Sequence, residues 1–155
     1  MKKLLAIFFV LSLGLVSFAG EQEDVQAMFN KYVNSANTYQ PTLLDLYSPN
    51  AKIIRQIIKP DGSTVNATTD MKTYAHQMKL SQSVAKMKHY TNSYSNVSVS
   101  KVSNGYKVSA YRTPMKNNDK LYTYQIWQKQ SDGSWVIIEE LMQTREQILL
   151  KYADK

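Results

Sequence analysis

The side chain of this sequence best placed to do chemistry is the carboxylate of Glu139, in a tyrosine-rich stretch near the C-terminus. If the apolar runs around it pair as a β-hairpin, Glu139 lies opposite Ile126 and shares a face with Tyr122 and Tyr124. Burial among aromatic rings raises the pKa of a carboxyl toward the range of a general base. Glu139 is therefore the candidate catalytic residue. The alternatives are a ligand contact without catalysis, an ion pair with a cation such as Arg55, or a solvated position.

The two histidines indicate chemistry less clearly. His76 lies beside the apolar stripe of a predicted helix, so we expect it to be solvated, whereas His89 lies on a predicted strand where it could face a pocket. They are far apart, and the sequence has no cysteine, so no metal site is expected. It also has no Gly-x-Ser-x-Gly elbow and no phosphate-binding glycine loop. We expect no cofactor.

Three further candidates have helical spacing. Tyr32 belongs to an apolar stripe that predicts a helix over residues 21–39. Tyr74 and Met78 belong to a second predicted helix, which Thr69 or Asp70 could cap. Side chains at such positions usually belong to the core, and the alternative is that they contact a ligand.

An Asp-Gly pair organises the C-terminal strands. A two-residue turn at Asp132-Gly133 predicts that Tyr124 lies opposite Leu141 and Trp127 opposite Ile138. One face of the hairpin then carries Tyr122, Tyr124, Ile126, Ile137, Glu139 and Leu141, and the other carries Leu121, Trp127, Val136, Ile138 and Met142.

A second hairpin precedes it. A turn at Asn104-Gly105 predicts that Val99 lies opposite Ala110. The apolar face of this hairpin then comprises Val97, Val99, Val108 and Ala110.

The remaining elements complete an α+β order. A short helical turn is expected over 42–47, a strand over 51–58, a polar loop from there to Thr69, and a long strand from Met87 to about Ser100. We therefore predict three N-terminal helices packed on a strongly curved, mostly antiparallel sheet. A single domain should span 20–144, followed by a tail, 145–155, that could form a short helix.

The N-terminus predicts export. Lys2 and Lys3 precede an apolar run that ends in the small residues of Ser17-Phe18-Ala19, which is typical of a cleaved signal peptide over residues 1–19. We expect a secreted protein, in the periplasm of a bacterium, without stable membrane insertion after cleavage. Outside this segment the chain has 17 of its 19 basic residues and all 12 acidic ones, which gives a formal charge of +5. They are scattered along the chain, so nucleic-acid binding is not expected.

Two phrases of this sequence resemble the nuclear-transport-factor-2-like superfamily, which includes ketosteroid isomerases and polyketide-cyclase-like proteins. The first is Leu43-Leu44-Asp45-Leu46-Tyr47-Ser48-Pro49-Asn50-Ala51, and the second is Asp132-Gly133-Ser134-Trp135-Val136-Ile137. The resemblance covers residues 21–144. It implies a cone in which helices lie against a curved sheet and leave a pocket at the open end. It also implies homodimers that pack sheet against sheet.

The resemblance does not carry a catalytic set to this chain. Isomerase-like members have an acid, their general base, five residues after the last acid of the first phrase. Asn50 stands at the place of that last acid here, and five residues further on this sequence has Arg55. Polyketide-cyclase-like members often have a histidine four residues after the closing tryptophan, where this sequence has Glu139. The family's Trp-x-Ile pattern places the face of Glu139 inside the cone.

The sequence thus predicts a secreted domain that binds a small apolar or amphipathic ligand without altering it. The predicted ligand contacts are Tyr32, Tyr74, Met78, His89, Tyr122, Tyr124, Ile126, Glu139 and Leu141. One alternative is a lyase or isomerase that uses Glu139. The other is an interaction module, or homodimer, whose sheet face includes Trp127.

Overall fold

The computed structural model describes residues 5–155, with side chains from residue 20 onward. Its elements are α1 (Leu5–Asn37), the 3-10 helix η1 (Pro41–Leu46), β1 (Tyr47–Ile58), β2 (Thr64–Asp70), α2 (Met71–Met87), β3 (Asn92–Val102), β4 (Gly105–Pro114), β5 (Leu121–Lys129), β6 (Trp135–Thr144) and the 3-10 helix η2 (Gln147–Tyr152). The predicted signal peptide, 1–19, lies outside the residues whose side chains are described. Among the residues that are fully described, no helix is both long and apolar enough to cross a membrane.

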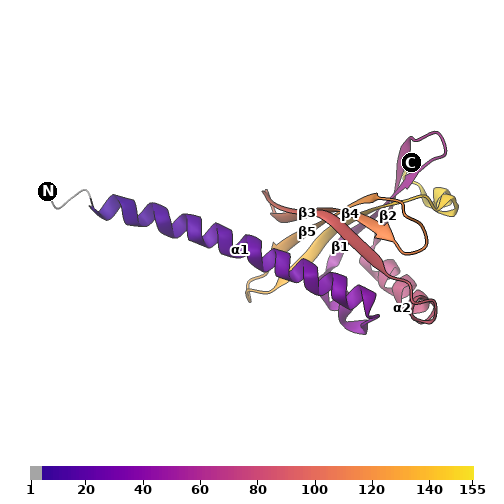
Figure 1. Cartoon of the computed structure of the whole chain (residues 1–155), viewed down its shortest axis with the longest axis horizontal. Coiled ribbons are helices and arrows are strands. Elements are labelled where there is room, and N and C mark those ends of the chain that lie inside the picture. The colour runs from indigo at the N-terminus through magenta and orange to yellow at the C-terminus, as the bar shows by residue number, and fades with distance from the viewer. Residues whose placement is uncertain (1–4) are drawn as a thin grey trace.

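The six strands form one sheet in the order β2-β1-β6-β5-β4-β3 (Figure 1). All neighbouring pairs are antiparallel except β1 and β6, which run parallel. The helices α1 and α2 pack against one face of this curved sheet, α1 over β3 and β4 and α2 over β1 and β2. We call this the inner face and the other the outer face. The predicted α+β class is confirmed.

Two details of the predicted element order are wrong. The helices are not three N-terminal ones, because η1 is a 3-10 helix and α2 follows the β1–β2 hairpin. The segment predicted as a polar loop forms β2, since its threonines and valine pair with the β-branched residues of β1. In contrast, α2 begins as predicted, with the Asp70 side chain accepting a hydrogen bond from the Thr73 backbone amide at 2.7 Å.

The β5–β6 hairpin contains two irregularities. Its loop has three residues, Ser131 to Gly133, because the amide of Gln130 donates to the carbonyl of Ser134 and Gly133 adopts φ +85°. Trp127 therefore pairs with Ile137, which corrects the predicted pairing with Ile138. A bulge at Ile138 then restores the predicted pairs, Ile126 with Glu139 and Tyr124 with Leu141.

The β3–β4 hairpin turns at Ser103-Asn104, one residue earlier than predicted, so that Val99 pairs with Val108. Gly105 belongs to β4, where a Cβ atom would lie 2.0 Å from the Trp127 carbonyl oxygen of β5. Only glycine fits there, so Gly105 is required by its contact with β5 and not by the turn. The pair Asn104-Gly105 therefore indicates the wrong position for the turn. A second bulge, around Asn96 with φ +53°, leaves Val97 exposed and not on the apolar face.

The core lies between the inner face and the helices. Its largest fully buried side chain is that of Trp127, and Val25, Phe29 and Tyr32 of α1 pack in the same cluster. The inner face carries Ile53, Arg55, Tyr106, Val108, Ala110, Arg112, Gln125, Trp127, Ile137, Glu140 and Met142. Ile137 lies opposite Trp127 on this face, so its predicted place beside Glu139 is wrong.

Candidate functional site

A buried carboxylate lies at the centre of the inner face. Glu140 is 0% exposed, and the bulge at Ile138 is what turns it, rather than Glu139, toward the helices. Three side chains donate hydrogen bonds to it: Tyr47 at 2.5 Å, Gln125 at 3.0 Å and Arg55 at 3.1 Å. A buried charge is tolerated only when it is paired and hydrogen-bonded, and Glu140 is both.

The network continues on both sides of Glu140. Trp127 donates from its indole Nε1 to Gln125 Oε1 at 3.2 Å. The guanidinium of Arg55 lies over the ring of Tyr74, 5.2 Å from its centroid. These contacts join β1, β5, β6 and α2, so the network fixes the relative positions of the elements around the space above the sheet.

The tyrosines near this network are held neutral. Burial and then the charge of Glu140 raise the pKa of Tyr32 and Tyr47 well above the ordinary tyrosine value of 10.0. Burial opposes the charged form of Arg55, but Glu140 and the neighbouring tyrosines raise its pKa above the ordinary value. The tyrosines are therefore hydrogen-bonding hydroxyls and cannot serve as bases near neutral pH.

A cavity of about 390 Å³ lies beside the network, between α1, α2 and the sheet. Its walls are aromatic and aliphatic, with tyrosines from α1, α2 and β3 and with Leu43, Met78 and Met142. Its lining also includes Ser81, an exposed residue of α2. Of the predicted ligand contacts, the structure brings together Tyr32, Tyr74 and Met78 at this cavity.

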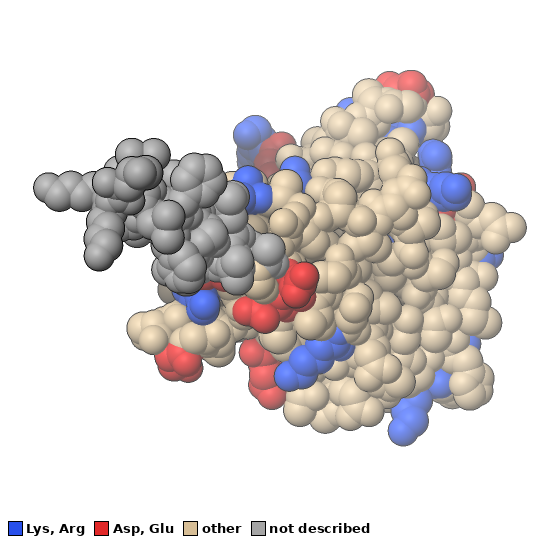
Figure 2. Space-filling model, turned by 60° about the vertical axis from the view of Figure 1, so that its left-hand side comes forward, with Lys and Arg blue, Asp and Glu red and all other residues tan. Residues whose placement is uncertain are grey.

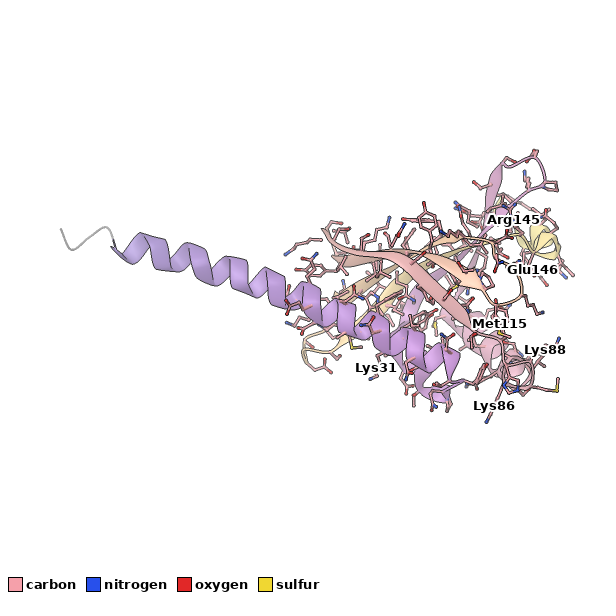
Figure 3. The ribbon with its side chains drawn as sticks, in the orientation of Figure 1. Lys31, Lys86, Lys88, Met115, Arg145 and Glu146 are labelled. Atoms are coloured by element: carbon pink, nitrogen blue, oxygen red, sulfur yellow. The ribbon has the colours of Figure 1, made fainter. Side chains whose placement is uncertain are left out.

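Two arginines form the charged part of the cavity wall. Arg55 is bound to Glu140, with 23% of its side chain exposed. Arg112 of β4 is 8% exposed; its Nη1 donates to Asn92 Oδ1 and its Nη2 to the carbonyl of Gln143, both at 2.9 Å. The basic ends of Lys86 and Lys88 lie where α2 finishes, close in sequence to the cavity residues Ala85 and Tyr90 (Figure 3).

The assignment of Glu139 to the inside of the cone is wrong. Glu139 lies on the outer face and accepts a hydrogen bond from the Tyr124 hydroxyl at 2.6 Å. Burial, together with this contact, raises the pKa of Tyr124. The predicted contacts Tyr122, Tyr124, Ile126 and Leu141 lie on the same outer face as Glu139, away from the cavity. The physical reason is the one-residue bulge, which reverses the alternation of β6 before Glu139.

His89 and Trp127 also lie in places other than those predicted. His89 is exposed, with φ +50°, in the turn between α2 and β3, and does not lie on a strand. His76 is exposed on α2, as predicted. Trp127 is 0% exposed on the inner face, so it cannot form a docking surface. Among the described residues, no three His, Asp or Glu side chains gather where they could hold a metal ion.

Sequence reasoning missed the polar residues that matter most, which are Arg55 as a partner of Glu140, Glu140 itself and Arg112. One signal was present, because a Glu-Glu pair inside a strand buried on both faces must direct one carboxylate inward. Arg112 likewise alternates with the inward residues Val108 and Ala110.

No protein-family model matches this chain, and no curated protein matches it in sequence. Solved structures do match. A nuclear-transport-factor-2-like protein of unknown function from Pseudomonas putida KT2440 has a TM-score of 0.62 at 7% identity, over 81% of this chain and 87% of that one. Another, with a cystatin-like fold, from Novosphingobium aromaticivorans, has a TM-score of 0.60 at 9% identity, over 94% and 92%.

A protein from Shewanella frigidimarina, described provisionally as a ketosteroid isomerase, has a TM-score of 0.54 at 14% identity, over 74% of this chain and 89% of that one. The fold predicted from the two sequence phrases is therefore confirmed as the nuclear-transport-factor-2-like, cystatin-like cone. At these identities the similarity shows the fold, and the function has to be argued from the site.

Proposed function

We propose that this protein binds a small amphipathic molecule in the cavity between its helices and its sheet, without altering it. The observation that carries the proposal is the cavity of about 390 Å³, since its size and its mainly aromatic and aliphatic wall suit an organic ligand. The few polar groups on the wall can orient such a ligand.

The proposal of binding without turnover rests on where the acidic side chains lie and on the hydrogen bonds that they already accept. Glu140 is occupied by three donors, and Glu139 lies on the other side of the sheet. The described residues that line the cavity include no Asp, Glu or His. A general base that contacts the ligand is therefore missing from the described wall.

Ligand-observed NMR and thermal-shift measurements against steroids, aromatic acids and lipids test the proposal. We expect at least one class to bind and to raise the melting temperature. Met78→Trp puts a bulkier side chain into the cavity and should weaken binding, whereas Met87→Trp, at an exposed position of the same helix, should leave it unchanged. Unchanged affinity in a folded Met78→Trp variant would place the ligand elsewhere.

A second candidate is an interface on the outer face. Tyr111, Tyr122 and Tyr124 form a row of ring contacts there, with centroids 6.1 and 6.2 Å apart, and Tyr111 is 41% exposed. A second copy of the chain could cover this row. Sedimentation equilibrium tests it: we expect a dimer that Tyr111→Asp dissociates, and a monomer at high concentration would contradict it.

We also propose that the protein acts after export. The support is the sequence of residues 1–19, with its basic start, apolar run and Ser17-Phe18-Ala19. The charged residues on the face drawn in Figure 2 are scattered, without a large patch of one sign, which disfavours a nucleic acid as partner. Mass spectrometry of the protein made in a bacterium should find a mature chain beginning near Gly20. A full-length chain retained in the cytoplasm would contradict export.

A further inference from the structure

Arg112 is a buried cation whose hydrogen bonding is incomplete. The residue is 8% exposed, and both of its hydrogen bonds go to neutral acceptors, the amide of Asn92 and the carbonyl of Gln143. Its Nε is buried and has no hydrogen-bond partner within the described chain. A buried polar group left in this state is unfavourable and calls for an explanation, of which a bound anion is one.

No acid of the described chain supplies that partner. The ion pairs of the described residues join Arg55 to Glu140, Lys129 to Glu21, and Arg145 to Asp119, and Arg112 takes part in none of them. No carboxylate is found among the described residues that line the cavity. Among the described residues of the wall, Arg55 is matched by Glu140, whereas Arg112 has no acidic partner.

The guanidinium has the right shape for an oxyanion such as a carboxylate. Nε and Nη2 form one edge of its planar fork, and such an edge binds a carboxylate through two parallel hydrogen bonds. Lys86 and Lys88 are exposed at the C-terminal end of α2, close in sequence to the cavity residues Ala85 and Tyr90. Their positive charge favours the approach of an anion.

Resting on the proposed function, we propose that the ligand is a carboxylate with an apolar or aromatic body, and that Arg112 binds the carboxylate. The body lies among the tyrosines, Leu43 and Met78, and the carboxylate accepts hydrogen bonds from the Nε–Nη2 edge of Arg112. Because Nε is covered by protein atoms, binding requires this side chain to turn slightly toward the cavity.

The test compares two probes of the same shape, 2-naphthoate and the uncharged 2-naphthamide, by isothermal titration calorimetry. A hydrogen-bonded charge pair in a buried site should make naphthoate bind about tenfold to a hundredfold more tightly. Arg112→Gln should remove the preference. Arg145→Gln, which changes an exposed arginine that does not line the cavity, is the matched control and should keep it. Decanoate and decanol form a second pair that distinguishes an aliphatic from an aromatic body.

The outcomes separate this inference from the proposed function. Equal binding of the charged and uncharged probes overturns the inference and leaves the proposed function standing. Failure of every compound in the wider panel to bind overturns both. A preference for naphthoate that persists in a folded Arg112→Gln variant shows that another group holds the anion.

Arg112→Gln could fail to fold, because its side chain bridges β3 and β6. The unaltered protein then decides the question by NMR. Naphthoate should shift the Arg112 Nε–H resonance, assigned in labelled protein, and naphthamide should not. An unmoved resonance at saturating naphthoate overturns the assignment.

Discussion

Glu139→Gln and Glu140→Gln make the same change at adjacent residues on opposite faces of β6. At Glu140 the change removes a buried charge, leaves the Arg55 guanidinium without its partner, and turns an acceptor into an amide that faces three donors. Removing one member of a buried ion pair costs about 3–5 kcal/mol. A domain of this size should then lose on the order of 10 °C in melting temperature.

Glu139→Gln is the control, because its carboxylate is partly exposed and accepts one hydrogen bond, from Tyr124. We expect it to cost less than about 1 kcal/mol. Urea unfolding followed by circular dichroism measures both free energies of unfolding. Equal losses in the two variants would show that the bulge does not separate the two carboxylates as described.

A double variant sharpens the test. Removing a buried ion pair as a whole is often far less costly than removing one partner. Glu140→Gln combined with Arg55→Met should therefore recover part of the stability that Glu140→Gln loses. If the two losses simply add, Arg55 and Glu140 do not act as a pair.

Three further outcomes follow from the structure. Tyr32, Tyr47 and Tyr74 have a raised pKa in the folded protein, so the unfolded chain ionises first. Their contribution to folding stability is present below the ordinary tyrosine pKa of 10.0 and is lost as pH rises above it. Absorbance at alkaline pH should show these residues ionising only as the protein unfolds. Gly105→Ala should destabilise the protein more than Gly133→Ala, measured by urea unfolding, because only at Gly105 would the new Cβ meet a backbone oxygen. The pKa of Asp154 is lowered by its hydrogen bonds from Thr68, so its contribution to stability is present above the ordinary value of 3.8 and is lost as pH falls through the lowered pKa. Asp154→Asn should therefore make urea midpoints less sensitive to acid below about pH 4.

Local sequence signals sufficed for most of the elements, although not for β2, and they did not suffice for the faces. The helical stripe around Tyr32, the Asp70 cap and the two hairpins each depend on neighbouring residues, and each was predictable. The β5–β6 hairpin shows the limit. Its three-residue loop and its bulge at Ile138 offset one another, so counting from the turn gave the correct partner for Glu139. The face was wrong because the alternation of Trp135 and Ile137 was continued through the bulge to Glu139.

The candidate site was harder to predict because its parts come together only in the tertiary structure. Tyr32 and Tyr74 were found from helical spacing. Arg55 was recognised as a cation, but its partner depends on the parallel pairing of β1 with β6, which no local pattern indicates. To predict that Arg112 points inward, one needs both the alternation of side chains along β4 and the knowledge of which face of the sheet the helices cover.

The parallel pairing of β1 with β6 also has a consequence for synthesis on the ribosome. Tyr47 of β1 and Glu140 of β6 are 93 residues apart in the sequence. β1 is therefore the first strand to be synthesised, and one of its two edges pairs with β6, the last strand to be synthesised. Contacts between such distant segments form slowly, because a long loop has to close first. While the chain is being translated, β1 keeps one edge unpaired, and the native sheet can close only after Thr144 has left the exit tunnel.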